Sequence, residues 1–102
     1  MIFHITTPET WETAQLINKY ESTSLEKEGF IHCSTKSQVI NIANTFYSDY
    51  EQLIVLEINP DKLLAEIKWE SPVHPNPDLE YNINGTEKFP HVYGVINLDA
   101  VE

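Results

Sequence analysis

The sequence predicts an α+β domain, and three observations lead to this fold class. The chain has 102 residues, a length that suits a single domain over residues 1–102. Its apolar pattern switches between strand-like and helix-like stretches in the first half and is mostly strand-like afterwards. The resulting order, β-α-β-α followed by several strands, is typical of an α+β domain.

The first strand and the first helix are predicted at the N-terminal end. Residues 2–6 (IFHIT) are strand-like. Thr7 followed by Pro8 is typical of a helix N-cap and first helical position, and Thr6 with Glu9 offers an alternative capping box. The helix should run to about residue 20, with one face that carries Trp11, Ala14, Ile17 and Tyr20.

A polar segment, a second strand and a second helix are expected next. Residues 21–29 are polar and could hold a short edge strand around Ser24. A strand then covers residues 30–34, and Ser34 or Thr35 caps the helix that follows. The apolar face of this amphipathic helix carries Val39, Ile40, Ala43, Phe46 and Tyr47.

The second half of the chain is predicted to consist mainly of strands. Residues 53–58 (LIVLEI) are almost continuously apolar and predict a central strand, and residues 66–70 (EIKWE) alternate like a strand. Residues 61–65 form a turn, which can hold one helical turn, and the proline-rich residues 71–78 form a loop. The remaining expectations are a short strand at 80–83, a turn at Asn84-Gly85, a last strand or pair of strands over 89–98 and a helical turn over 98–102.

Composition and charge narrow the classes of function. The chain has 16 Asp and Glu, 6 Lys and no Arg, and its formal net charge is −10. Nucleic acid is not expected as a partner, because Lys and Arg supply most of the affinity for a phosphate backbone. There is no signal-like start and no run of 18 apolar residues, so a cytoplasmic protein without a membrane span is expected. A single cysteine, Cys33, fits the same compartment, and the oligomeric state is left open.

Three of the four histidines share a local pattern that predicts a polar cleft. Each lies on a predicted strand, and each is followed two residues later by a residue with a hydroxyl group. Residues i and i+2 of a strand point to the same face, so each imidazole should point the same way as its hydroxyl. The pairs are His4 with Thr6, His32 with Ser34, and His91 with Tyr93.

Such a cleft suits a ligand rich in hydroxyls, amides or phosphates, because imidazole and hydroxyl groups both donate and accept hydrogen bonds. The Ser34-Thr35 step at a helix start would add free backbone N–H groups and a positive dipole end, which suits a phosphate even without Arg. Purely structural roles are the alternative. Strand histidines are commonly satisfied polar residues, Ser34 and Thr35 can be helix caps, and Tyr93 can pack.

Other residues offer weaker chemistry. No metal is expected, because the histidines lack metal-ligand spacing and Cys33 adds only one thiol; a three-histidine zinc site assembled in space is the alternative. Cys33 alternates away from its neighbouring histidine and is expected to be buried. Glu57 stands out because it interrupts an apolar strand. Trp11 and Trp69 are expected in the core, and His74 is expected to be solvated.

The order of several motifs resembles a bacterial family known only as domain of unknown function 952. The motifs are FHIT at 3–6, GFIHCST at 29–35, VLEINPDKL and IKWE in the middle, and FPHVYG with INLDAV near the end. The resemblance covers essentially the whole chain. This family is similar in fold to the ADP-ribosyltransferase superfamily, whose members bind NAD in a cleft of a split, strongly bent sheet. The resemblance therefore implies one compact domain with a bent, mostly antiparallel split sheet and two main helices.

The same resemblance implies roles for the three histidine motifs. Residues 4–6 match the His-x-Thr motif on the first core strand of the superfamily, so His4 would hold the nicotinamide ribose or amide. His32 matches a histidine in the second motif of the RNA 2'-phosphotransferase branch and would face the nicotinamide. The third motif offers His91 and Tyr93 where protein-modifying transferases carry a glutamate, and the chain lacks the arginines of the phosphotransferases.

The sequence thus predicts a small domain with an NAD-like or nucleotide-like ligand cleft. If the domain is a transferase, it acts at the nicotinamide–ribose bond, through an oxocarbenium-like state that needs orientation and electrostatic support more than a strong base. The alternative is a non-catalytic module that senses a nucleotide or ADP-ribose, or that binds a protein. The expected catalytic residues are His4, His32 and His91, and the expected ligand-binding residues are Thr6, Ser34, Thr35 and Tyr93.

Overall fold

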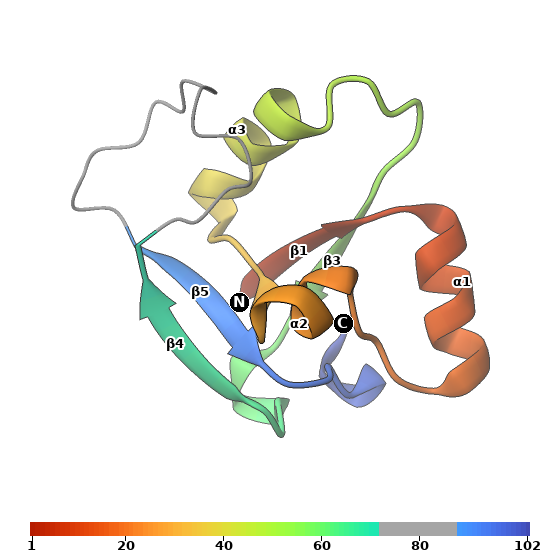
Figure 1. Ribbon diagram of the computed structural model, residues 1–102, viewed down its shortest axis with the longest axis vertical. Helices are drawn as coiled ribbons and strands as arrows, with labels where there is room; N and C mark the ends of the chain where they lie inside the picture. The colour runs from red at the N-terminus through yellow and green to blue at the C-terminus, as the bar shows by residue number, and fades with distance from the viewer. Residues whose placement is uncertain (72–87) are drawn as a thin grey trace.

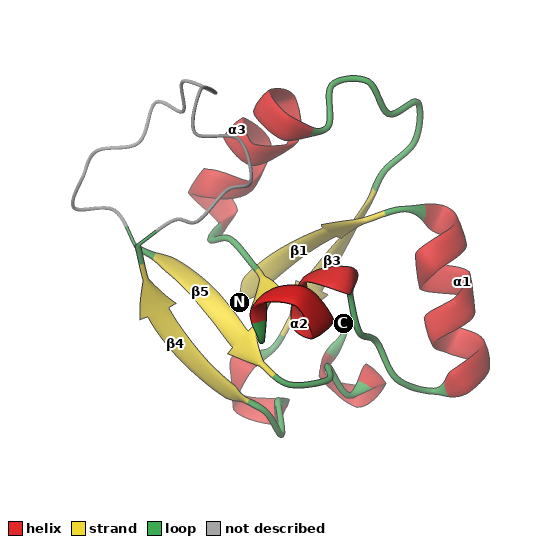
Figure 2. Ribbon diagram, viewed as in Figure 1, coloured by secondary structure: helices red, strands yellow, loops and turns green. Residues whose placement is uncertain are grey.

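Two antiparallel sheets form the framework of the protein, in a computed structural model that describes residues 1–71 and 88–102 (Figures 1 and 2). The first sheet pairs β1 (Ile2–Thr6) with β3 (Ile54–Ile58), in the register Ile2 to Ile58. The second has the strand order β2-β5-β4. Its strands are β2 (Ile31–His32), β5 (Phe89–Tyr93) and β4 (Glu66–Glu70). The fold is α+β, as predicted, and the strands pair in antiparallel fashion throughout the described residues.

Within residues 1–71 and 88–102, a single isolated β-bridge joins the two sheets. The Phe3 N–H donates to the Ser34 carbonyl at 2.8 Å, and the Ser34 N–H donates to the Phe3 carbonyl at 2.7 Å. Beyond this bridge the two sheets diverge (Figure 1). The second strand is shorter than the predicted 30–34. Residues 31–32 pair with β5, whereas Ser34 pairs with Phe3 of the other sheet.

The first helix, α1 (Pro8–Ile17), begins where the sequence predicts and ends earlier. Thr7 caps it as expected, since its hydroxyl accepts a hydrogen bond from a backbone N–H of the first turn. Asn18 then takes the left-handed conformation, with a φ of 61°, and ends the helix before Tyr20. Ile17, which the helical periodicity would bury, is 51% exposed, whereas Tyr20 is buried from its position after the helix.

The polar segment before the second strand is a helix and not an edge strand. This helix, α2 (Thr23–Glu28), is a third α-helix where two were predicted. It ends at Gly29, whose φ of 88° is readily adopted only by glycine and whose N–H donates to the Leu25 carbonyl at 3.0 Å. The prediction of an edge strand around Ser24 was wrong because it took no account of Gly29, although glycine is typical of a helix C-cap.

The next helix, α3 (Lys36–Phe46), carries a complete capping box. The Thr35 hydroxyl accepts from the Gln38 N–H at 3.3 Å, and the Thr35 N–H donates to the Gln38 side-chain oxygen at 2.9 Å. Val39 is buried as predicted, while Ile40 is 67% exposed. The helix packs on β1.

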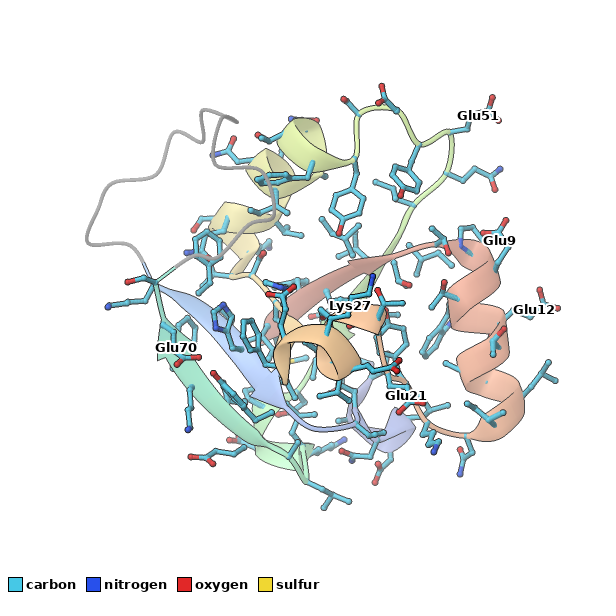
Figure 3. All side chains as sticks on the ribbon, in the orientation of Figure 1. Glu9, Glu12, Glu21, Lys27, Glu51 and Glu70 are labelled. Atoms are coloured by element: carbon cyan, nitrogen blue, oxygen red, sulfur yellow. The ribbon has the colours of Figure 1, made fainter. Side chains whose placement is uncertain are left out.

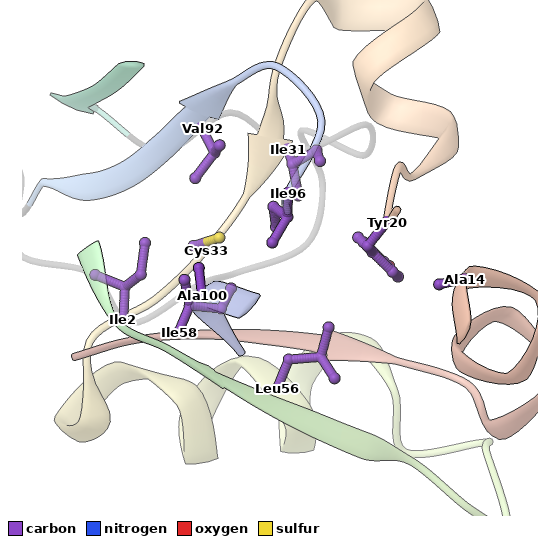
Figure 4. Close-up of a cluster of buried hydrophobic side chains, with 10 residues drawn as sticks. All are labelled: Ile2, Ala14, Tyr20, Ile31, Cys33, Leu56, Ile58, Val92, Ile96 and Ala100. Atoms are coloured by element: carbon purple, nitrogen blue, oxygen red, sulfur yellow. The ribbon is translucent and has the colours of Figure 1, made fainter. Parts of the chain in front are cut away.

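The core lies where the inner faces of the two sheets and the segments around them meet (Figure 4). Strand β3 is not a central strand: it pairs with β1 on one side, and on the other a bridge from Ile58 to Val101 covers its end. Its outer face is open to solvent, which explains why Glu57 interrupts the apolar run. The buried apolar cluster contains Ile2, Ala14, Tyr20, Ile31, Cys33, Leu56, Ile58, Val92, Ile96 and Ala100.

Several further expectations can be compared with the structure. Cys33 is buried, as predicted, and Trp11 packs against the core cluster. Trp69 is 53% exposed, so its assignment to the core was wrong: it lies on β4, an edge strand with a solvent-facing side. The helical turns were correctly predicted and are 3-10 turns, Pro60–Lys62 and Leu98–Ala100. The expected strand at 80–83, the turn at Asn84-Gly85, His74 and nearly all of the proline-rich loop lie outside the described residues.

The capping box predicts a stability effect that separates a structural role of Thr35 from a binding role. Thr35→Ala removes the hydroxyl cap and should lower the free energy of unfolding by about 1 kcal/mol. Thr35→Ser keeps the hydroxyl and should recover most of this loss. Urea unfolding followed by circular dichroism measures both, and a Thr35→Ala variant as stable as the parent protein would contradict the prediction.

Candidate functional site: a cavity where the sheets diverge

A cavity of about 620 Å³ opens beyond the bridge that joins the two sheets. The lining residues come from β1, β2 and β5, from α1 and α3, and from the segment that leads from Tyr20 into the start of α2. Five of the seven residues that the sequence singles out are among the lining residues. They are His4, Thr6, His32, Ser34 and His91.

The other two residues, Thr35 and Tyr93, do not line the cavity. Thr35 is engaged as the N-cap of α3. The Tyr93 hydroxyl donates to a carboxylate oxygen of Glu70 at 2.5 Å. The i, i+2 rule therefore brings the hydroxyl into the cavity for two of the three pairs, and the third hydroxyl is directed to a carboxylate on the neighbouring strand.

His4 is the centre of a buried polar network. Its Nδ1 lies 2.5 Å from the His32 carbonyl oxygen, and its Nε2 lies 2.6 Å from the Tyr20 hydroxyl. A carbonyl only accepts, so Nδ1 carries the proton and Nε2 accepts from Tyr20. Burial lowers the pKa of His4 to about 4 and raises the pKa of Tyr20 to about 12. Both groups are therefore neutral near pH 7.

The other two histidines lie side by side on paired strands. His32 and His91 are register partners of β2 and β5, and their ring centroids are 5.5 Å apart. Phe30 stacks on the His91 ring at 4.2 Å with an interplanar angle of 18°. Each imidazole also contacts a carboxylate: His32 Nε2 lies 3.2 Å from Glu28, and His91 Nδ1 lies 2.9 Å from Glu70. The result is a pair of carboxylate–histidine units on one wall.

Glu70 is the functional candidate that sequence reasoning missed. Figure 3 labels its side chain on β4. One oxygen of Glu70 accepts from both His91 and Tyr93, and these hydrogen bonds, the one from Tyr93 first, lower the pKa of the Glu70 carboxyl. The same contact with Glu70 raises the pKa of Tyr93. Glu70 ends β4 and lies two residues beyond Lys68, the register partner of His91. The pairing of the segments EIKWE and FPHVY would have indicated this contact, but their register was not predicted.

The backbone donors expected for a phosphate are already used. The Ser34 N–H donates to the Phe3 carbonyl at 2.7 Å, and the Thr35 N–H donates to Gln38 at 2.9 Å. The prediction that the Ser34-Thr35 step has free N–H groups is therefore wrong. They are occupied because the same residues bridge the sheets and close the capping box.

Cysteine and metal chemistry find little support at the cavity. Burial raises the pKa of the Cys33 thiol, which keeps it protonated and unreactive. Among residues 1–71 and 88–102, no three His, Cys, Asp or Glu side chains are grouped so that they could hold a metal ion. In the same residues no helix is long and apolar enough to cross a membrane.

The buried state of His4 predicts a dependence of stability on pH. Its pKa is about 4 in the folded protein and near 6.5 when the chain unfolds, so the unfolded state binds the proton first as the pH falls. The stabilising effect of a neutral His4 is present above pH 6.5 and is lost progressively towards pH 4, by about 3 kcal/mol in all.

Two measurements check this pH dependence. NMR titration of the His4 ring should give a pKa at least one unit below that of a free histidine, and the Nδ1–H tautomer at neutral pH. Urea unfolding of His4→Gln should show a weaker loss of stability between pH 6.5 and 4.5 than the parent protein. A His4 pKa near 6.5 would contradict the buried network.

Comparisons with known proteins agree with this fold. The crystal structure of protein CC0527 from Caulobacter crescentus matches with a TM-score of 0.79 and 25% sequence identity, over 98% of this chain and 79% of that chain. A double mutant of the same protein matches equally well, at 24% identity. The comparison with curated proteins found no match. A family model described as protein of unknown function, DUF952, matches residues 5–102. The chain therefore belongs to the DUF952 family of proteins of unknown function.

Proposed function

We propose that the cavity is a ligand cleft for an NAD-like or nucleotide-like molecule, and that the domain is an ADP-ribosyltransferase-like transferase of the cytoplasm. One observation carries the proposal. Three histidines from segments far apart in the sequence, His4, His32 and His91, line a single cavity. Structural histidines have no need to converge on one open space, whereas residues that serve a common ligand do.

The size and lining of the cavity support a small organic ligand. A volume of about 620 Å³ lies within the range of ligand sites in proteins. Phe46, Tyr47 and Phe89 give it aromatic surface for a base or a pyridine ring. Histidine rings and hydroxyls such as that of Thr6 provide the few polar groups that orient a sugar or an amide.

The three histidines have different roles in this proposal. Both ring nitrogens of His4 have protein partners, so His4 acts by holding the Tyr20 hydroxyl in place at the cavity wall. His32 and His91 each have one ring nitrogen on a carboxylate, and the other, Nδ1 of His32 and Nε2 of His91, has no partner within the described residues. These two nitrogens are the groups that meet the ligand.

Cleavage of a nicotinamide–ribose bond matches these groups. The bond breaks with positive charge developing on the ribose, and the nearby carboxylates favour that charge. Glu70 holds the tautomer of His91 in which Nε2 accepts a hydrogen bond from a ribose hydroxyl or an acceptor. Split antiparallel sheets with a cavity between them also fit the resemblance to ADP-ribosyltransferases.

A non-catalytic sensing module is the second candidate. Glu21 is the only carboxylate among the described lining residues, and Glu70 is outside the lining and engaged by Tyr93 and His91. A transferase that modifies proteins needs a free carboxylate beside the acceptor. Binding of ligand without any release of nicotinamide during long incubation would favour the sensing module.

Ligand binding is tested by NMR titration of labelled protein with NAD, ADP-ribose and nicotinamide. We expect shifts confined to the cavity residues, and we expect His32→Ala to weaken binding by about tenfold or more, because it removes a hydrogen-bonding group from the wall. Thr13→Ala, on an exposed position of α1 outside the lining, is the control. Absence of shifts at millimolar concentrations of all three probes would refute the ligand cleft.

Catalysis has its own test in the Glu70–His91 contact. Glu70→Gln removes the charge that holds the His91 tautomer, and the rate of nicotinamide release from NAD should fall by about tenfold while the dissociation constant changes little. Glu66→Gln, at the other end of β4, should leave the rate unchanged. Chromatography of the released nicotinamide gives the rate, and equal rates in both variants would remove Glu70 from the mechanism.

A further inference from the structure

No lysine or arginine lines the cavity to receive a phosphate, and every such side chain of the chain lies among the described residues. The sequence contains no arginine, and its six lysines all lie among the described residues. None of the lysines lines the cavity. Lys27 of α2 (Figure 3) is exposed and outside the lining. The six are Lys19, Lys27, Lys36, Lys62, Lys68 and Lys88.

Backbone donors at the starts of α1 and α3 do not replace the missing cations. At the start of α3, the N–H groups of Ser34 and Thr35 are bound within the protein. At the start of α1, Pro8 has no N–H and the Thr10 N–H donates to the Thr7 hydroxyl at 3.2 Å. Glu9 adds a carboxylate to that same first turn, where an anion would otherwise be attracted. The start of α2 does line the cavity, and the Ser22 side chain does not cap it. Glu21 and Glu26 flank that start, however, and their carboxylates oppose an anion there.

The charges that are present favour the opposite kind of ligand. Glu21, just before α2, lines the cavity (Figure 3), and the net charge of −10 adds a repulsive field for anions. The aromatic rings of Phe46, Tyr47 and Phe89 can stack on a base, and their faces attract a cationic ring. Lining hydroxyls such as that of Ser24 match the hydroxyls of a sugar.

We propose that the cleft takes an uncharged or cationic nucleoside without phosphate, such as a ribose linked to a nicotinamide cation, and discriminates against nucleotides and dinucleotides. This inference rests on the proposed function and narrows it. The nicotinamide–ribose unit that would be cleaved is retained, while the pyrophosphate of NAD finds no counter-charge. Electrostatics thereby determine the class of ligand, and His32 and His91 still contact its nicotinamide–ribose unit.

A matched series of ligands tests the inference. Nicotinamide riboside, nicotinamide mononucleotide and NAD share one nicotinamide–ribose unit and differ in having no phosphate, one phosphate and a pyrophosphate. Isothermal titration calorimetry at low salt should give the riboside the lowest dissociation constant, by about tenfold relative to NAD. Adenosine and AMP form a second pair, in which adenosine should bind more tightly. Raising the salt to 0.5 M should narrow both differences, because salt screens the repulsion.

Two variants locate the discriminating charge. Glu21→Gln removes the carboxylate that lines the cavity, and it should weaken binding of the riboside and strengthen binding of the mononucleotide, each by about threefold. Glu26→Gln removes an equivalent charge from an exposed position of α2 outside the lining, and it should have a smaller effect on both.

The outcomes distinguish the inference from the function on which it rests. Tighter binding of the riboside than of NAD supports it. NAD binding as tightly as the riboside, or more tightly, overturns the inference and leaves the proposed ligand cleft intact. If none of the five compounds binds at millimolar concentration, the proposed function itself is wrong and the inference falls with it.

Discussion

The pair of hydrogen bonds between Phe3 and Ser34 is the constraint on which the rest of the structure depends. It is the only β-bridge between the two sheets in the described residues, and it fixes where they stop running together. On one side of it the sheets share the apolar core. On the other side they separate, and the space between them becomes the cavity. The bond from His4 to the His32 carbonyl continues this connection by one residue, with a side chain in place of a backbone group.

The hydrogen bonds of the His4 ring explain why a buried histidine is tolerated at this position. A polar side chain in a core is costly unless each of its groups has a partner, and His4 has a partner at both ring nitrogens. The network also holds Tyr20, which arrives from a loop and not from a regular element. His4 therefore serves stability and geometry together. By contrast, His32 and His91 each have one ring nitrogen without a partner among the described residues. They are therefore the better candidates for contact with a ligand.

Local signals in the sequence predicted much of the fold and singled out residues that lie at one cavity. The caps at Thr7 and Thr35 and the alternating strands were predicted correctly because each depends on neighbours in the sequence. The i, i+2 rule places the hydroxyls of Thr6 and Ser34 beside the same cavity as their histidines for the same reason, whereas the convergence of the pairs depends on how the two sheets assemble. The exposed Trp69 and the contact of Glu70 with His91 could not be predicted, because they depend on strand order and register, which are properties of the assembled sheet. The helix α2 was missed for a local reason, because Gly29 is its C-cap.

The bridge between Ile58 and Val101 has a consequence for behaviour in a crowded solution. In the part of the chain that the structure describes, no strand pairs with the edge of β3 opposite β1, and such edges invite pairing with strands of other molecules, which leads to aggregates. Residues 100–102 cover the end of this edge: the Asn59 N–H donates to the Ala100 carbonyl and the Glu102 N–H to the Glu57 carbonyl, both at 2.8 Å. These hydrogen bonds occupy backbone groups of the edge that a strand of another molecule could otherwise bind. The negative charge of Glu57 on the open face further disfavours such association.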